Sequence, residues 1–383
     1  MTQILLDVTR LARRLHEGLL PTGVDRVGLA YVEQYAARAR AVFSYGGFAA
    51  VLSDEDSLRI FDFLLTQQRK RSFVAASVLR GYGTSVLRER FENACLLHTS
   101  HNGMEYSRFY AAMGARGVRS VFMIHDLIPL THAEYCRPDV DKAHRIRIDT
   151  ALANADGLIA NSYDTERMLV QYAAERKLPL PPVAVAPLAS GVGGQASYPR
   201  LCDAPYFVML GTIEPRKNHW FMLHIWRRLV EAHGSAAPRL VIIGRRGWEC
   251  ENAIDMLERC EALRQHVIEE THCDDARLRA WLTHARALLF PSFVEGYGMP
   301  LVEALEMRLP VIASELAVFR EIAGDIPDYL DPLDGPGWTR RVLDYTLDDS
   351  PARDRQIARI GNFRAPTWSE HFLRIDTFLA TIG

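Results

Sequence analysis

The sequence predicts an α/β protein of two parallel-sheet domains. Its 383 residues exceed one typical hydrophobic core and fit two domains of ordinary size. Short apolar runs alternate with segments of helical periodicity along most of the chain, as expected for successive βα units. A stretch rich in proline, glycine and small polar residues, 187–205, separates two such series and predicts a linker.

The first series predicts a domain over residues 1–195. Apolar runs bounded by turn residues mark its strands, and stretches with helical apolar spacing fill several of the gaps. We expect strands at 4–8, 41–45, 94–98, 120–125, 157–161 and 182–186, and helices near 24–38, 139–155 and 163–176.

The second series is more regular and predicts a domain over residues 203–365. Its strands are nearly continuous in apolar character, which favours a parallel sheet covered on both faces. The C-terminal segment 366–383 is expected to form a helix that packs back on the first domain. We expect strands at 206–210, 239–244, 266–270, 286–292 and 309–314, and helices at 218–234, 250–264, 274–285 and 300–308.

Composition excludes several functional classes. Hydrophobic residues make up 48% and charged residues 24% of the chain, which is typical of a soluble globular protein. The net charge of -2 gives no reason to expect a nucleic-acid partner. Charged side chains precede any apolar run of signal-peptide length, and no apolar stretch reaches about 18 residues. We therefore expect a cytoplasmic protein.

No metal or cofactor is expected. The six cysteines form no CxxC pair. The nearest approach to a metal cluster is His266, His272 and Cys273, which buried thiols and surface histidines explain equally well. Residues 191–196, GVGGQA, are interpreted as linker because no helix follows to receive a pyrophosphate. The DVD triplet at 139–141 is interpreted as a helix cap.

The segment 290–305, FPSFVEGYGMPLVEAL, carries the clearest chemical signal. A strand precedes it, and Pro300 is a natural first residue for a helix. Glu295 should then lie in the loop at the carboxyl end of the strand, and Glu303 in the first turn of the helix. Gly296 and Gly298 let the backbone approach a ligand closely.

This arrangement suits a nucleotide-sugar. The free N–H groups of a helix start bind an anion such as a diphosphate. Carboxylates on either side of that anion accept hydrogen bonds from sugar hydroxyls, and a nucleotide-sugar has one sugar on each side of its diphosphate. The alternative is structural: Glu303 complements the helix dipole and Glu295 caps a turn.

Two further loops support the ligand interpretation. In GTIEPRKNH, 211–219, Arg216 and Lys217 stand at a predicted helix start, where cations are disfavoured unless an anion joins them. In GRRGW, 244–248, Gly244 and Arg245 follow the next strand. The carboxyl ends of parallel strands share one edge of a sheet, so all three loops should meet there.

These segments resemble the E-x7-E signature region of retaining nucleotide-sugar glycosyltransferases of family four. The resemblance covers most of 205–335. In the first half, TGVDRV (22–27) resembles the glycine-rich acceptor-side loop of the family, and MIHDLIPL (123–130) resembles its strand-end histidine motif. The family has the GT-B fold, in which two Rossmann-like parallel-sheet domains face a cleft.

The resemblance implies a role for each matching residue. Glu295 would contact the transferred sugar, Glu303 the ribose, and Lys217 the diphosphate. His125 would face the sugar from the other domain, unless it is simply a strand-end histidine bonded to a neighbour. Further donor contacts are expected from Arg216, Gly244, Arg245, Gly296, Tyr297, Gly298, Met299 and Gly23, and acceptor contacts from Asp25, Arg26 and Asp126.

Two departures from the family pattern affect these roles. Thr212 stands where many members have arginine, so one phosphate cation is either missing or supplied by Arg216. Asp25 stands where a further glycine is frequent, which would add an acceptor contact. Asp126 remains open between an acceptor contact and a turn former.

The function implied is retaining, metal-independent transfer of a sugar from a nucleoside diphosphate to a glycan or lipid-linked oligosaccharide. The motif variants resemble mannosyl- or rhamnosyl-type transferases of bacterial surface polysaccharides such as lipopolysaccharide, so mannose or a related hexose is the expected sugar. Two alternatives stay open. One is a GT-B enzyme of other chemistry, a phosphorylase or a nucleotide-sugar epimerase, and the other is a non-catalytic sugar-nucleotide-binding subunit.

The basic stretch 67–91 allows two interpretations. It carries Arg69, Lys70 and Arg71 among apolar residues, a pattern that can bind the anionic inner face of a membrane. Peripheral contact there would bring the enzyme to a lipid-linked acceptor. The same stretch also fits an ordinary solvated helix and loop with its apolar residues turned to the core.

Overall fold

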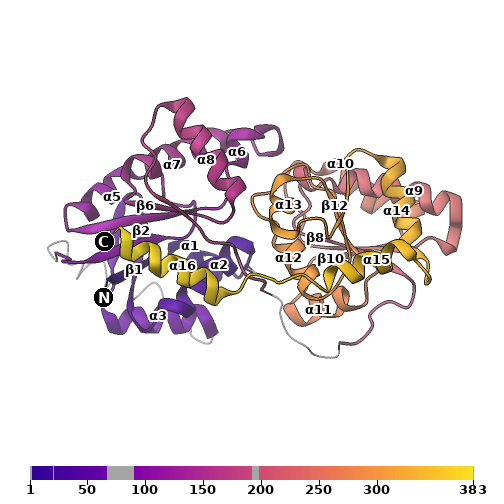
Figure 1. Cartoon of the computed structure of the whole chain (residues 1–383), viewed down its shortest axis with the longest axis horizontal. Coiled ribbons are helices and arrows are strands. Elements are labelled where there is room, and N and C mark those ends of the chain that lie inside the picture. Colours follow the sequence, from indigo (N-terminus) through magenta and orange to yellow (C-terminus); the bar gives the residue numbers. More distant parts are fainter. Residues whose placement is uncertain (1, 20, 67–89, 192–197, 383) are drawn as a thin grey trace. The chain divides into compact units, whose positions relative to one another are not determined.

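The computed structural model describes residues 2–19, 21–66, 90–191 and 198–382. The chain divides into two compact units, each with its own sheet (Figure 1). Unit 1 comprises Met1–Leu130, Asp139–Leu188 and Pro366–Gly383, and unit 2 comprises Thr131–Pro138 and Ala189–Ala365.

The sheet of unit 1 has the strand order β3-β2-β1-β4-β5-β6-β7 and is parallel except at β3. Its strands are β1 (Gln3–Asp7), β2 (Ala39–Tyr45), β3 (Phe48–Val51), β4 (Ala94–His98), β5 (Val118–Ile124), β6 (Gly157–Ala160) and β7 (Val183–Val185). Its helices are α1 (Thr9–His16), α2 (Gly23–Tyr35), α3 (Asp54–Thr66), α5 (Ser107–Gly114), α6 (Ile128–Thr131), α7 (Val140–Asn154), α8 (Tyr163–Arg176) and α16 (Trp368–Thr381).

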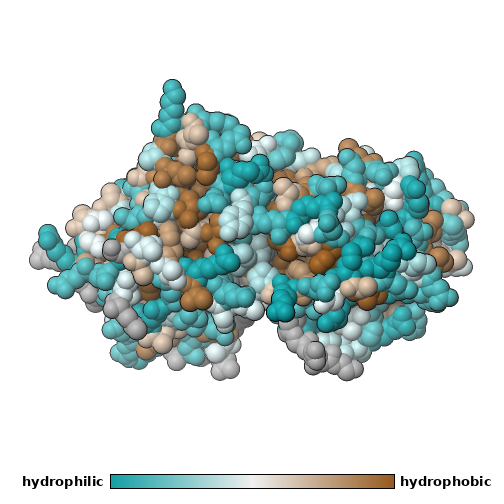
Figure 2. Space-filling view, viewed as in Figure 1, coloured by the Kyte–Doolittle hydropathy of each residue, from teal (hydrophilic) through white to brown (hydrophobic). Residues whose placement is uncertain are grey.

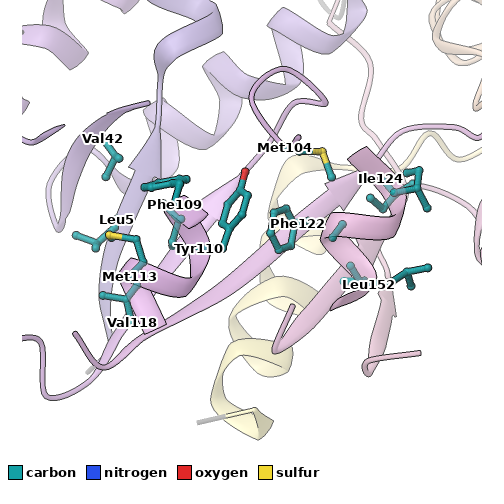
Figure 3. Packing of buried hydrophobic residues seen from close by; sticks show 14 of the residues in the cluster. Leu5, Val42, Met104, Phe109, Tyr110, Met113, Val118, Phe122, Ile124 and Leu152 are labelled. Carbon is teal, nitrogen blue, oxygen red and sulfur yellow. The ribbon is translucent and has the colours of Figure 1, made fainter. Parts of the chain in front are cut away.

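Aromatic side chains fill much of the core between this sheet and α5. Tyr110 on α5 packs edge-to-face on Phe122 of β5, with ring centroids 4.6 Å apart (Figure 3). Phe109 and Met113 from the same helix lie toward Leu5 of β1. The apolar runs that predicted the strands thus face this helix, and their burial favours the folded state.

Unit 2 has a fully parallel sheet with the order β10-β9-β8-β11-β12-β13. Its strands are β8 (Tyr206–Leu210), β9 (Arg239–Ile243), β10 (Val267–Glu270), β11 (Leu288–Phe290), β12 (Val311–Ser314) and β13 (Asp328–Leu330). Its helices are α9 (His219–His233), α10 (Glu251–Arg259), α11 (Asp275–His284), α12 (Met299–Glu306), α13 (Ala317–Ala323), α14 (Gly335–Thr346) and α15 (Pro351–Ile360), with short 3-10 turns at η1 (Ala133–Tyr135), η2 (Pro215–Lys217), η3 (Gly234–Ala236) and η4 (Glu261–Leu263).

Both faces of this sheet are covered, as its apolar strands predict. Successive residues of β8 enter different cores: Tyr206 and Val208 join one cluster, and Phe207 and Met209 join the other. The strand order reverses beside β8, because β9 lies on one side of it and β11 on the other. The loops after β8 and β11 therefore lead to helices on different faces, and ligands of open α/β sheets bind at such a point.

Residues Thr131–Pro138 lie with unit 2, although the predicted first domain ran without interruption over 1–195. Tyr135 stacks on Phe293, with centroids 5.2 Å and planes 4° apart. The guanidinium of Arg137 lies 5.1 Å from the ring centroid of Trp248. These contacts join residues far apart in the sequence, so local patterns could not predict them.

Asp139 occupies the N-cap position of α7 with φ of 66°, but its side chain makes no cap hydrogen bond. The carboxylate instead accepts from Lys142 Nζ at 2.6 Å, and this ion pair lowers the pKa of Asp139. Asp139 is thus the helix cap that the DVD triplet predicted, although it caps α7 by position and not through a side-chain hydrogen bond.

Hydrophilic residues cover most of the face shown in Figure 2, and hydrophobic ones gather in smaller patches. Within the residues that the structure describes, no helix is both long enough and apolar enough to cross a membrane. Residues 67–89 of the basic stretch and 192–197 of the GVGGQA segment lie outside the described residues.

Helix α16 belongs to unit 1 and lies beside its N-terminal helices (Figure 1). Phe372 packs edge-to-face on Tyr31 of α2, with centroids 5.1 Å apart. His371 is buried between Tyr31, whose hydroxyl lies 3.0 Å from Nε2, and the Pro187 carbonyl, 3.0 Å from Nδ1. Burial lowers the pKa of His371 to about 4, so the imidazole is neutral at neutral pH.

We expect acid to weaken the attachment of α16. The pKa of His371 in the folded chain lies below its ordinary value of 6.5, so its stabilisation is complete above 6.5 and is lost as pH falls toward about 4. The lowered pKa of His371 corresponds to a loss of about 3 kcal/mol in the free energy of unfolding over this pH range. The hydrogen-exchange protection factors of the α16 amides, which correct for the pH dependence of intrinsic exchange, should fall over this range, and His371→Gln should abolish that part of the pH dependence. An identical fall in the protection factors of the variant would contradict the assignment to His371.

Candidate functional site

Three loops meet at the carboxyl edge of the unit 2 sheet, where the strand order reverses. The backbone N–H of Ile213 donates to the Arg245 carbonyl at 3.0 Å, which joins the loops after β8 and β9. The N–H of Phe293 donates to the Arg216 carbonyl at 2.9 Å, which joins the loops after β11 and β8. Gly244 makes the first approach feasible, because a Cβ there would lie 1.9 Å from the Gly211 carbonyl oxygen.

A chain of four alternating charges fills the junction of two of these loops. Lys217 Nζ lies 2.6 Å from Glu295 Oε1, and Arg216 Nη1 lies 2.6 Å from Glu295 Oε2. Arg216 Nη2 lies 2.6 Å from Glu214 Oε1. The Ser292 hydroxyl donates to Glu295 Oε1 at 2.7 Å. We call Glu214, Arg216, Glu295 and Lys217 the ion network.

The ion network is withdrawn from water. Glu214, Lys217 and Glu295 are buried, and Arg216 is half-buried. Burial alone would raise the pKa of Glu295, but Arg216 and Lys217 outweigh it and hold the pKa at about 2. Burial lowers the pKa of Lys217, and Glu295 opposes that shift. The 2.6 Å contact favours the charged pair, so Glu295 is an anion and Lys217 a cation at neutral pH.

The sequence predicted that an anion would accompany the two cations at this helix start. In the structure that anion is the protein's own Glu295, with Glu214 on the far side of Arg216. Glu214 and Ser292 were not among the predicted site residues. Glu214 had a visible signal, since it precedes two cations within EPRKN, but a pattern does not show which acid pairs with which base.

The helix after the third loop begins at Met299, and Gly298 is its N-cap residue with φ of 117°. A Cβ on Gly298 would lie 2.7 Å from the Phe319 ring, so glycine is required by both space and backbone conformation. Glu303 is buried, but it is the fifth residue of α12. The prediction that it lies in the first turn is therefore wrong, and it is too far along the helix to complement the dipole.

The other predicted donor residues of unit 2 lie in the same three loops or, for Met299, at the start of α12. Tyr297 is buried, Gly296 and Met299 are half-buried, and the Arg245 side chain is exposed. The predicted cations and carboxylates of the second half are thus brought together on one edge of one sheet.

The predicted residues of the first half form a second group, within unit 1. His125 follows β5 and is buried; its Nε2 donates to the Thr99 carbonyl at 2.8 Å. Burial lowers the pKa of His125, and the Thr99 bond opposes the shift. With the proton on Nε2, Nδ1 carries a lone pair that can accept from a hydroxyl. The carboxylate of Asp126 accepts from the Ile128 N–H at 3.1 Å, which is a turn-forming contact, and its acceptor contact stays a prediction.

Asp25 has a structural role that the sequence did not suggest. It is buried and forms a capping box with Thr22 at the start of α2. Its oxygens also lie 2.8 Å from Arg10 Nε and 2.6 Å from Arg14 Nε. Protein groups thus surround its carboxylate, and the acceptor contact of Asp25 stays a prediction. Gly23 is exposed with open space around its Cβ position, and Arg26 is half-buried.

The described residues include no group of three or more histidine, cysteine or acidic side chains arranged to hold a metal ion. Of the weak cluster noted in the sequence, His272 Nδ1 lies 2.9 Å from the Thr271 hydroxyl, and burial raises the pKa of Cys273 to about 11. That thiol is therefore protonated at neutral pH.

The family described as Glycosyl transferases group 1 matches residues 204–335. These residues form a glycosyl transferases group 1 domain. The whole ion network, Glu303 and all three loops fall within it. The resemblance predicted from the E-x7-E segment is thereby confirmed.

Two curated relatives extend the match. The serotype-specific mannosyltransferase WbdA of Escherichia coli is 29% identical over 245 residues, which cover 59% of this chain and 29% of WbdA. The O-antigen chain mannosyltransferase B of Escherichia coli is 32% identical over 146 residues, 38% of each chain. This chain therefore matches well under half the length of either relative.

A solved structure matches along the whole chain. Anabaena Alr3699/HepE, in complex with UDP and glucose, covers 100% of both chains with a TM-score of 0.68 and 13% identity. A likeness at this identity concerns the fold alone. The chain has the GT-B fold, with two α/β units built on parallel sheets, and the predicted fold class is confirmed.

We expect Glu295→Gln to change the acid stability of unit 2. The pKa of Glu295 in the folded chain lies below its ordinary value of 4.5, so its stabilisation is present above 4.5 and is lost as pH falls toward about 2. At neutral pH the free energy of unfolding of unit 2 should be about 3 kcal/mol higher in the wild type than in the variant, because Glu295→Gln leaves two cations without their anion. Hydrogen exchange in β8 and β11 reports this difference.

The control is Glu306→Gln, which changes an exposed acid at the end of α12. Its stability should follow the wild type at every pH. If the difference in free energy of unfolding between the wild type and Glu295→Gln does not decrease as the pH falls, Glu295 does not belong to the ion network.

Proposed function

We propose that the chain is a retaining glycosyltransferase, which moves a sugar from a nucleoside-diphosphate sugar to a glycan hydroxyl in the synthesis of a bacterial surface polysaccharide such as O-antigen. The buried contact between Lys217 and Glu295, at the point where the strand order reverses, carries this proposal. A cation meets a carboxylate there beside the amides that begin α12, so the site offers partners to both a diphosphate and a sugar.

Mannose or a related hexose is the proposed sugar. The support is the likeness to two proteins whose names describe mannosyltransferases, across residues that include the ion network. The proposed acceptor is a glycan or a lipid-linked oligosaccharide. We place the enzyme in the cytoplasm, with peripheral contact to the anionic inner face of the membrane through the basic stretch 67–91.

In this reaction the bond between the anomeric carbon and the diphosphate oxygen breaks. The acceptor hydroxyl forms the new bond on the same face of the sugar, and its proton passes to the departing phosphate oxygen. Lys217 and the first amides of α12 stabilise the charge that grows on the diphosphate. Glu295 accepts from hydroxyls of the transferred sugar, Glu303 holds the ribose, and Nδ1 of His125 accepts from a sugar hydroxyl.

We further propose that no metal ion is required. Lys217 and Arg216 supply positive charge, and the N–H groups of α12 supply oriented dipoles, where metal-dependent transferases place a cation. Arg216 supplies positive charge in place of the arginine that many family members carry at the position of Thr212, while Lys217 is the principal phosphate ligand.

The decisive experiment supplies GDP-mannose and other nucleotide-sugars, each with and without a mannose-containing acceptor, in EDTA. We expect nucleoside diphosphate to be released chiefly when acceptor is present, and the product to keep the anomeric configuration of the donor. Release of sugar phosphate would indicate a phosphorylase, and interconversion of donors an epimerase. Binding without turnover would indicate a binding subunit, and activity restored only by manganese or magnesium would exclude the metal-free mechanism.

Lys217→Ala should weaken nucleoside diphosphate binding by about 1.5–3 kcal/mol, because it removes a charge-assisted hydrogen bond. Arg216→Ala should weaken binding less and stability more, since the Arg216 guanidinium already binds Glu214, Glu295 and the Val294 carbonyl. Calorimetry measures the first effect and denaturation the second. Lys142→Ala, at an exposed lysine of unit 1, is the matched control. A larger binding loss for Arg216→Ala would make Arg216 the principal phosphate ligand.

Glu295→Gln should reduce turnover by about tenfold or more, equivalent to about 1.4 kcal/mol of barrier, and change nucleoside diphosphate binding less than Lys217→Ala does. The reason is that Glu295 is assigned to the transferred sugar, and the variant keeps the Lys217 cation. Rates are compared at saturating donor and corrected for the folded fraction, with Glu306→Gln in parallel. Unchanged turnover would take Glu295 out of the reaction.

A further inference from the structure

A cavity lies beside the ion network, within unit 2. Its volume is about 540 Å³, which is within the usual range for sites that bind small molecules. The first halves of α9 and α10 form its walls, together with parts of the loops after β8, β9, β11 and β13. It includes Glu214 of the ion network but none of Lys217, Glu295 and Glu303, so it is separate from the proposed donor site.

Aromatic rings line this cavity. Tyr135 and Phe293 are stacked on each other, and Trp220 and Phe221 belong to the first turn of α9. Trp220 is 51% exposed, an unusual degree for so large an apolar ring, and its edge contact is with His224 at 4.9 Å. Flat rings at the edge of a cavity offer a surface to the C–H face of a sugar.

One buried polar side chain in the cavity wall lacks a partner. His219 is 3% exposed, and neither of its ring nitrogens has a hydrogen-bond partner among the described residues. Burial, with Lys217 and Arg216 nearby, lowers the pKa of His219 to about 3, so the ring is neutral. Both nitrogens are closed to solvent, so the ring forms part of the cavity wall and offers no hydrogen bond to a ligand there.

We propose that this cavity binds a hexopyranose residue of a glycan chain. A hexopyranose presents a C–H face to the aromatic rings and hydroxyls that can donate to the Glu214 carboxylate in the same wall. A phosphate would meet two carboxylates, Glu214 and Glu249, against the single guanidinium of Arg228, so the charge of the cavity wall disfavours it.

The identity of the ligand as a glycan rests on the proposed function. In that setting the cavity holds one sugar of the acceptor chain while another sugar of that chain reacts. Acceptors of several sugars should therefore bind more tightly than a single sugar, because the second contact is intramolecular once the first has formed.

The test is saccharide binding to the full chain, measured by saturation-transfer NMR and calorimetry with methyl α-mannoside and a linear mannotetraose. We expect dissociation constants in the millimolar range, tighter for the tetraose. Trp220→Ala should weaken tetraose binding about tenfold and leave nucleoside diphosphate binding unchanged. Tyr163→Ala removes a ring that is 59% exposed on α8, outside the cavity, and should have no effect.

Saccharide binding that depends on Trp220 supports the proposal that the cavity binds a sugar, even where no sugar transfer is detected. The absence of transfer would contradict only the proposed function. Three results overturn the cavity proposal while transfer remains intact. They are no binding of either saccharide, tetraose binding equal in wild type and Trp220→Ala, and a nucleoside diphosphate or lipid vesicle bound through Trp220 in place of the saccharide.

Discussion

The contact of Glu295 with Lys217 and Arg216 is the constraint on which the site of unit 2 depends. Two cations beside the start of a helix oppose the helix dipole, and burial makes each of them less favourable. A carboxylate from a loop 78 residues further along the chain offsets both effects. The loops after β8 and β11 are therefore held by electrostatics as well as by backbone hydrogen bonds, and the charged groups are oriented before a ligand arrives.

The ion network can form only because the backbone brings the two loops together. Strand β8 pairs with β9 on one side and β11 on the other, which places the ends of β8 and β11 next to each other. Glycine at 244 allows the loop after β9 to contact the loop after β8, and glycine at 298 lets α12 begin against Phe319. Sheet order sets which loops meet, and these two glycines set how closely they pack.

The sequence predicted most strands because a buried parallel strand is an uninterrupted apolar run. Strands β4 and β8 occur at the predicted residues, whereas the edge strands β3 and β13 were missed because each is short and only partly buried. The site was predicted as a set of residue types at one sheet edge. Its pairing was not, because periodicity carries no information on which of Glu214, Glu295 and Glu303 contacts a given cation.

Glu214 is the residue for which the missing information on charge pairing matters most. Burial raises the pKa of Glu214, and Arg216 and Lys217 oppose that shift, so its charge depends on the rest of the ion network. The same residue lines the cavity beside Trp220 and His219. A ligand that donates a hydrogen bond to Glu214 would bind the same carboxylate that forms an ion pair with Arg216. Arg216 also forms an ion pair with Glu295. Occupation of the cavity and the orientation of Glu295 are thus linked through one guanidinium.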